Sequence, residues 1–194
     1  MSQLLFVTKN KDKILEINKL INNTIKLLSL EDINFTNDIE ETENTLEGNA
    51  LLKARTIFTK TNINCFADDS GLLVDALNGE PGVYSARYAG DQKNDEDNIS
   101  KLLTNLEHIK NRSAQFKTVL ALIIDGKEHS FEGIIKGSIS FVRKGTEGFG
   151  YDSVFIPDGF TKSFAEMSLE EKSEISHRAL AFKKMVEFLN SKEN

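Results

Sequence analysis

The chain has 194 residues and a formal net charge of −6; 39% of the residues are hydrophobic and 28% are charged. This composition is ordinary for a soluble globular protein of one domain or two closely joined lobes, and no apolar run approaches the roughly 18–20 residues of a membrane span. The acidic balance argues against a nucleic-acid partner, the single cysteine, Cys65, excludes an intrachain disulfide, and the absence of a signal-peptide pattern predicts a cytoplasmic protein.

The first third of the chain has a strand–helix–strand pattern. Residues 4–8 form an apolar run typical of a buried strand, and apolar residues then recur at helical spacing between positions 14 and 21. Residues 25–30 are a second candidate strand. After an acidic, polar stretch, Thr45 is a suitable N-cap for a helix whose apolar residues lie between positions 46 and 58. The segment therefore predicts an α/β fold.

The middle of the chain alternates short apolar runs with turn signals. Residues 64–67 predict a short strand that leads into Asp68 and Asp69, which would then lie where the strand ends. Residues 94–106 predict a helix. Residues 115–124 and 129–142 predict two long strands, and Asp125-Gly126 between them is a strong hairpin signal.

The last quarter of the chain predicts one further strand and a helical end. The strand is expected at residues 153–156, directly after a glycine-rich loop. Ser168 and Glu171 have the spacing of a capping box, and apolar residues between positions 179 and 189 line one face of the last helix. Taken with the preceding elements, the pattern predicts an α/β fold with a mixed sheet.

A cationic cluster follows the first predicted strand. Thr8, Lys9, Asn10 and Lys13 lie where this strand leads into a helix, whose N-terminus carries unpaired N–H groups and the positive end of the dipole. An anion such as a triphosphate would relieve the repulsion between the lysines and this helix end. The alternative is a surface turn with solvated lysines.

Acidic residues in two places could hold a divalent cation. Glu40 and Glu41 offer hard oxygen ligands for Mg²⁺, although acidic loops are often only solvated. Asp68 and Asp69 are adjacent, and neighbouring residues on a strand face opposite sides. One of these two carboxylates is therefore expected in the site and the other in a structural contact, and the spacing does not decide which. Ser70 would place a hydroxyl beside a phosphate at a helix start.

Two further segments could contact a base. The segment Gly145–Asp152 contains three glycines around Phe149 and Tyr151. Glycine lets the backbone approach a ligand closely, and an aromatic ring can stack on a base. The alternative is that these rings pack into the core. His177 and Arg178 open the last helix, and Arg178 can only donate hydrogen bonds, which suits a base with a 6-oxo group. Both can also be ordinary surface residues.

Several motifs in order resemble the inosine triphosphate pyrophosphatase family. The resemblance covers nearly the whole chain, and several separated motifs in one order are far more specific than any single motif. The motifs are Asp68-Asp69-Ser70-Gly71-Leu72, Gly82-Val83-Tyr84-Ser85-Ala86-Arg87-Tyr88, Gly148-Phe149-Gly150-Tyr151-Asp152 and Ser176-His177-Arg178.

The resemblance implies a fold and a reaction. The fold would be one two-lobed α/β domain over residues 1–194, with an elongated mixed sheet flanked by helices and a nucleotide cleft between the lobes. The reaction would be Mg²⁺-dependent hydrolysis of ITP, dITP and XTP to the monophosphate and pyrophosphate. The family also implies a homodimer.

The resemblance assigns roles to individual residues. Asp69 is the expected catalytic carboxylate and a metal ligand, with Glu40 as the second metal ligand. The expected phosphate ligands are Thr8, Asn10, Lys13, Lys53 and Ser70, with Lys9 as a further candidate from its position. The residues expected around the base and sugar are Phe149, Gly150, Tyr151, Asp152, Lys172, His177 and Arg178.

The chain departs from the family pattern at three positions. Lys9 and Glu147 stand where glycine is usual, and Ser153 stands where proline is common. These changes affect expected affinity and substrate preference rather than the reaction. The alternatives to the main interpretation are a pyrophosphatase for pyrimidine or modified nucleotides, a non-catalytic nucleotide-binding module, and an RNA-binding or protein-interaction domain. The acidic net charge weighs against RNA binding.

Overall fold

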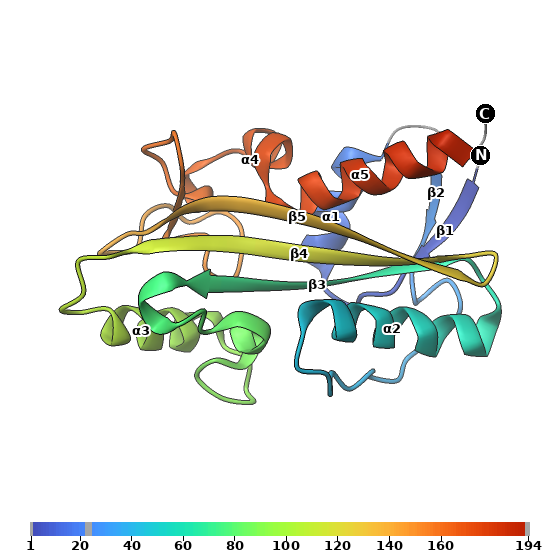
Figure 1. Cartoon of the computed structure of the whole chain (residues 1–194), viewed down its shortest axis with the longest axis horizontal. Helices are drawn as coiled ribbons and strands as arrows, with labels where there is room; N and C mark the ends of the chain where they lie inside the picture. The colour runs from blue at the N-terminus through green and yellow to red at the C-terminus, as the bar shows by residue number, and fades with distance from the viewer. Residues whose placement is uncertain (1, 22–24, 193–194) are drawn as a thin grey trace. The chain divides into compact units, whose positions relative to one another are not determined.

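The computed structural model describes residues 2–21 and 25–192 (Figure 1). The chain divides into two compact units. The first comprises residues 1–69, 118–133 and 178–194, and the second comprises residues 70–117 and 134–177. Among the described residues, no helix combines the length and the apolar character needed to cross a bilayer.

The described strands form one mixed sheet, as predicted. Its order is β2-β1-β3-β4-β5-β6; β1 pairs in parallel with both β2 and β3, and β5 pairs antiparallel with β6. The strands are β1 (Ser2–Phe6), β2 (Ile25–Leu28), β3 (Cys65–Val74), β4 (Ser113–Ile124), β5 (Lys127–Ile139) and β6 (Phe155–Pro157).

The helices begin at side chains that cap them. Asn10, Thr45, Asn94 and Ser168 each accept a hydrogen bond from the first turn of the helix that follows, which satisfies N–H groups that have no partner within the helix. The α-helices are α1 (Lys11–Leu20), α2 (Leu46–Thr61), α3 (Asp95–Asn105), α4 (Leu169–Ile175) and α5 (His177–Lys192), and the 3₁₀-helices are η1 (Asp75–Leu77), η2 (Gly82–Arg87) and η3 (Phe164–Glu166).

The first unit has a core on each face of its strands. Because side chains alternate along a strand, Leu4 and Phe6 of β1 pack with residues of α1 and α5, whereas Leu5 and Val7 pack with residues of α2. Figure 1 shows α2 on one side of these strands and α1 and α5 on the other. This arrangement brings the N-termini of α1 and α2 to opposite faces of β3.

The second unit has one core, built from sheet, helix and loop residues. Leu102 of α3 and Phe116 of β4 share it with Tyr151 and with Phe164 of η3. The ring of Phe116 lies 4.7 Å from the ring of Phe155 and 6.1 Å from the ring of Phe164, measured between centroids. The segment that carries the glycine-rich loop is therefore held by aromatic packing.

Most predicted elements are confirmed, but several strand bounds differ: β5 ends at Ile139 and not at residue 142, and β6 begins at Phe155 and not at residue 153. The hairpin turns at Asp125 and Gly126, whose φ angles are 51° and 73°. The strand expected at residues 64–67, however, continues to Val74 as β3, so Asp68 and Asp69 lie within a strand and not at its end, and Ser70 does not begin a helix. Polar residues are tolerated in this strand because each carboxylate has charged or amide partners.

Candidate active site

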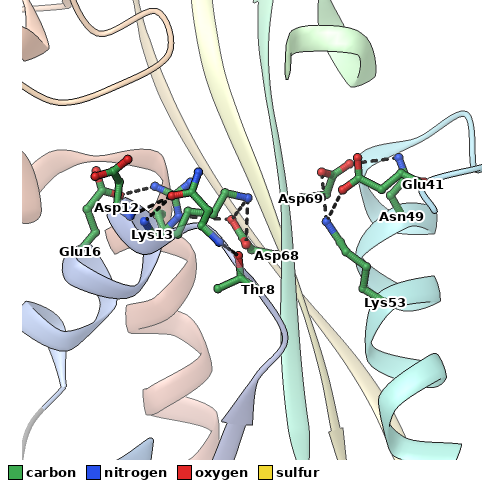
Figure 2. Close-up of polar contacts among 11 residues, drawn as sticks. Thr8, Asp12, Lys13, Glu16, Glu41, Asn49, Lys53, Asp68 and Asp69 are labelled. Carbon is green, nitrogen blue, oxygen red and sulfur yellow. Dashed lines mark hydrogen bonds and ion pairs between the residues drawn. The ribbon is translucent and has the colours of Figure 1, made fainter. Parts of the chain in front are cut away.

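Strand β3 separates the two adjacent carboxylates of the first unit. As expected for neighbouring strand residues, Asp68 and Asp69 point to opposite sides of β3 (Figure 2). Asp68 points toward α1, and Asp69 points toward α2. Both are buried, with 1% and 7% of their surface exposed. The two carboxylates therefore belong to two different sets of partners.

On one side of β3 lies the Asp68 cluster, which consists of Asp68, Lys13, Glu16 and Arg178. The ammonium of Lys13 lies 3.0 and 2.9 Å from the two carboxylate oxygens of Asp68. Arg178 donates through Nε to Asp68 at 3.2 Å and through Nη1 to Glu16. Two cations thus face two anions, so the cluster is balanced in charge.

The charges of this cluster shift the pKa values of its members. Burial alone would raise the pKa of Asp68, but Lys13 and Arg178 hold that pKa well below its usual range. Burial would lower the pKa of Arg178, and Glu16 and Asp68 raise it instead. Asp68 is therefore a permanent anion whose role is to hold two cations in place.

On the other side of β3 lies the Asp69 cluster, which consists of Asp69, Glu41, Asn49 and Lys53 (Figure 2). The Lys53 ammonium lies 2.7 Å from Glu41 Oε1 and 3.4 Å from Asp69 Oδ1. Asn49, one helical turn before Lys53 on α2, donates to Asp69 Oδ2 at 3.2 Å. Both Asp69 oxygens are thus fixed in direction.

The Asp69 cluster carries one negative charge in excess, because two carboxylates share one ammonium. Burial is the largest cause of the raised pKa of Asp69; Lys53 and Lys13 oppose this shift, while Glu41 and Asp68 add to it. A buried carboxylate close to a second carboxylate favours the approach of a cation.

Thr8, Asn10 and Lys13 lie at the start of α1, as the sequence predicted, but some of the N–H groups there already donate to the side chains of Thr8 and Asn10. The Asn10 side chain accepts from the N–H groups of Asp12 and Lys13, at 2.9 and 3.1 Å. The Thr8 hydroxyl accepts from the Asn10 N–H at 3.2 Å. Thr8 and Lys13 lie beside each other at this helix end in Figure 2.

Lys9 does not join the other cations of this segment. Its ammonium donates to the Thr36 carbonyl and to the Asp38 carboxylate, both at 2.6 Å, and 46% of the side-chain surface is exposed. Lys9 thus ties the β1–α1 connection to the acidic segment that precedes α2.

A separate cluster of predicted residues lies in the second unit. The buried Lys172 ammonium lies 2.5 Å from Asp152 Oδ2, which also accepts from the Phe149 N–H at 3.0 Å. The same ammonium lies 4.9 Å from the centroid of the Phe149 ring. Lys172 therefore orders an aromatic ring and a carboxylate at once.

The remaining predicted residues of this unit have different surroundings. Tyr151 is 4% exposed, and its hydroxyl donates to the Ser85 carbonyl at 2.8 Å, so its ring packs in the core. The His177 ring stacks on Phe116 with 4.6 Å between centroids and 10° between planes. Of the predicted aromatic pair, Phe149 is the partly exposed ring.

The family model of the Ham1 family matches residues 4–188. The chain belongs to the Ham1 family. The resemblance that the sequence motifs indicated is thereby confirmed over nearly the whole chain, and it does not depend on any one motif.

Relatives of the chain within the Ham1 family are similar over their full length. The dITP/XTP pyrophosphatase of Flavobacterium johnsoniae is 54% identical over 189 residues, which covers 97% of this chain and 98% of the relative. The dITP/XTP pyrophosphatase of Bacillus subtilis is 43% identical over 195 residues, with 98% of each chain covered.

Solved structures similar to this chain confirm the α/β fold. The Ham1 protein of Staphylococcus aureus is similar with a TM-score of 0.90 and 38% identity, over 98% of this chain and 100% of that one. A nucleoside-triphosphatase, or dITP/XTP pyrophosphatase, of Mycobacterium abscessus has a TM-score of 0.77 and 40% identity, over 94% of this chain and 98% of that one.

Sequence reasoning and structure differ most for the acidic segment before α2. Glu40, the expected metal ligand, is exposed, and its metal role stays a prediction, whereas the neighbouring Glu41 is the residue that shares Lys53 with Asp69. Glu16 was not predicted at all, since a single glutamate in an amphipathic helix gives no sign of burial. Asn49 could have been found from its spacing to Lys53.

Proposed function

We propose that this protein hydrolyses ITP, dITP and XTP to the corresponding monophosphate and pyrophosphate. The observation that carries the proposal is the Asp69 cluster, in which two carboxylates and an ammonium converge within one buried group. The names of the full-length relatives, dITP/XTP pyrophosphatase, support dITP and XTP among these substrates.

Mg²⁺ is the proposed cofactor, and Asp69 and Glu41 are the residues that would hold it. Within residues 2–21 and 25–192, no three His, Cys, Asp or Glu side chains form a ready-made metal cage. Two carboxylates with an excess negative charge still fit Mg²⁺, because this ion commonly binds one or two carboxylates together with substrate phosphates and water. Glu41 takes the place of Glu40 in this proposal because of its position beside Lys53.

The bound ion would supply positive charge to the phosphate oxygens and to the departing pyrophosphate. Asp69, whose two oxygens face Lys53 and Asn49, would accept a proton from the attacking water. As that proton leaves, the water oxygen bonds to the α-phosphorus, the anhydride bond between the α- and β-phosphates breaks, and pyrophosphate departs. Asn49 and Lys53 keep the Asp69 carboxylate oriented.

The remaining site residues are proposed to bind parts of the substrate. Thr8, Asn10, Lys13, Lys53 and Ser70 would bind the phosphates, and Lys9 would do so only by leaving Thr36 and Asp38. Phe149, Gly150, Tyr151, Asp152, Lys172, His177 and Arg178 would serve the base and sugar, with Phe149 as the stacking ring. Arg178 as a donor to the 6-oxo group stays a prediction. Replacing it in Arg178→Ala should lower the ratio of ITP to ATP hydrolysis, and an unchanged ratio would contradict this role.

The family resemblance also supports a homodimer, and the cytoplasmic location stays a prediction from the sequence pattern. A dimer would be detected by light scattering coupled to size-exclusion chromatography. A mass equal to the 21.7 kDa of one chain would contradict it.

The reaction is tested by measuring pyrophosphate and orthophosphate release from ITP, dITP, XTP, ATP, GTP and dTTP, with Mg²⁺ or with EDTA. We expect metal-dependent pyrophosphate release that strongly favours the first three nucleotides. Orthophosphate instead of pyrophosphate would indicate attack at the γ-phosphorus and contradict the proposal. Binding without any product would favour a nucleotide-binding module.

A further inference from the structure

The aromatic loop, defined as residues 145–152 of the second unit, has a backbone that its own sequence does not fix. Gly145, Gly148 and Gly150 adopt φ angles of 76°, 79° and 59°, in the left-handed region where glycine is favoured. Glycine has the largest conformational freedom to lose when a segment becomes ordered. A single conformation of this loop therefore requires hydrogen bonds from elsewhere in the unit.

Two consecutive N–H groups of the loop are bound by two carboxylates. The Phe149 N–H donates to Asp152, which lies within the loop. The next N–H, that of Gly150, donates to Asp95 Oδ2 at 2.7 Å. Asp95 is the first residue of α3, so this second contact ties the loop to a helix 55 residues away in the sequence.

The same end of α3 also holds the segment that leads into the loop. Arg143 contacts the Glu96 carboxylate at 3.0 Å and the Ser100 hydroxyl at 2.9 Å. Residues of the first two turns of α3 thus contact the chain on both sides of Phe149. The helix itself is fixed, because Ile99 and Leu102 are buried in the core of the unit.

We propose that Asp95 is a positioning residue for recognition of the base. Its carboxylate fixes the peptide group between Phe149 and Gly150, and through that peptide it fixes the direction of the Phe149 ring. A hydrogen bond from a backbone N–H to a carboxylate is charge-assisted and among the stronger kinds. Asp95 does not contact substrate in this proposal, which rests on the proposed function for the role of Phe149.

A second interpretation of Asp95 is an acidic residue that only stabilises the N-terminus of α3. Acidic side chains are favourable there because of the helix dipole. Asp97 provides the matched control, since it is exposed, lies in the same first turn and carries the same charge. A dipole effect would make the two residues equivalent, whereas a positioning role would single out Asp95.

The kinetic test compares Asp95→Ala, Asp95→Asn and Asp97→Asn. Asp95→Ala should raise KM for dITP by about tenfold, as expected for loss of one charge-assisted hydrogen bond, with a smaller change in kcat. Asp95→Asn keeps an acceptor oxygen and should recover most of the affinity, and Asp97→Asn should match the wild type. Inorganic tripolyphosphate, which lacks a base, should inhibit all four proteins equally.

A second measurement does not depend on catalysis. Hydrogen exchange followed by mass spectrometry on the ligand-free protein should show faster exchange of the peptide covering residues 145–152 in Asp95→Ala, and no change in Asp97→Asn. Equal exchange in the two variants, or an unchanged KM in Asp95→Ala, would overturn the proposal. If the wild type releases no pyrophosphate while the exchange difference is seen, the proposed function fails and the tethering of the loop stands.

Discussion

Replacing Glu16 by alanine tests whether the Asp68 cluster stabilises the first unit. Glu16 is 4% exposed, and its carboxylate is a partner of the guanidinium of Arg178, which is 1% exposed. Glu16→Ala leaves this guanidinium buried, and Asp68 is then shared by two cations, Lys13 and Arg178. A balanced cluster thereby becomes one with an excess positive charge in a buried environment.

The size of the effect follows from this imbalance. Removing one partner of a buried ion pair typically lowers the free energy of unfolding by 3–5 kcal/mol, because the other charge is left uncompensated. Since Asp68 still binds Arg178, we expect a loss of about 3 kcal/mol, at the lower end of that range. For a chain of this length such a loss lowers the melting temperature by roughly 6–12 °C.

The measurement is urea unfolding followed by far-ultraviolet circular dichroism, with melting temperatures from calorimetry. Glu187→Ala is the matched control, because Glu187 lies exposed on α5 and its removal should change stability by less than about 0.5 kcal/mol. Glu16→Gln, which keeps an acceptor oxygen, should fall between the two. If Glu16→Ala and Glu187→Ala have the same unfolding free energy, the ion pair between Glu16 and Arg178 does not stabilise the fold.

Three further outcomes are expected. Asp69→Asn should abolish turnover and raise the melting temperature at pH 7. The pKa of Asp69 is higher in the folded protein than in the unfolded chain, so the fold loses stability as the pH rises through these two pKa values and the carboxylate ionises. Lys53→Met should bind Mg²⁺ at least about tenfold more tightly without nucleotide, measured by calorimetry, because the ammonium between the two carboxylates repels the ion; equal affinity would contradict this. Gly148→Ala should raise KM for dITP, since the added Cβ would lie 2.1 Å from Asp152 Oδ2, while Gly159→Ala, with a similar φ of 83° and no atom within 4 Å, should leave KM unchanged.

Much of the fold was predictable because the capping residues, the turn residues and the apolar patterns of the sequence indicated the same elements. Thr45 caps α2 as its side chain predicted, and the Asp125-Gly126 turn adopts the positive φ angles that this pair of residues favours. The end of β3 was not predictable. A strand that continues through two carboxylates has lost its apolar pattern, and only pairing with neighbouring strands and cations from other segments keeps it extended.

The sequence by itself determined the residue types of the site and, through its motifs, the family. Only the tertiary structure decided how the carboxylates are partnered: Asp68 with Lys13 and Arg178, and Asp69 with Lys53 and Glu41. The physical reason is that a charge is stabilised by whatever lies within a few ångströms of it, and these partners come from segments up to 110 residues apart in the sequence. The spacing of residues along the chain predicts which side of a strand or helix a side chain lies on, but it does not predict which distant cation contacts a buried carboxylate.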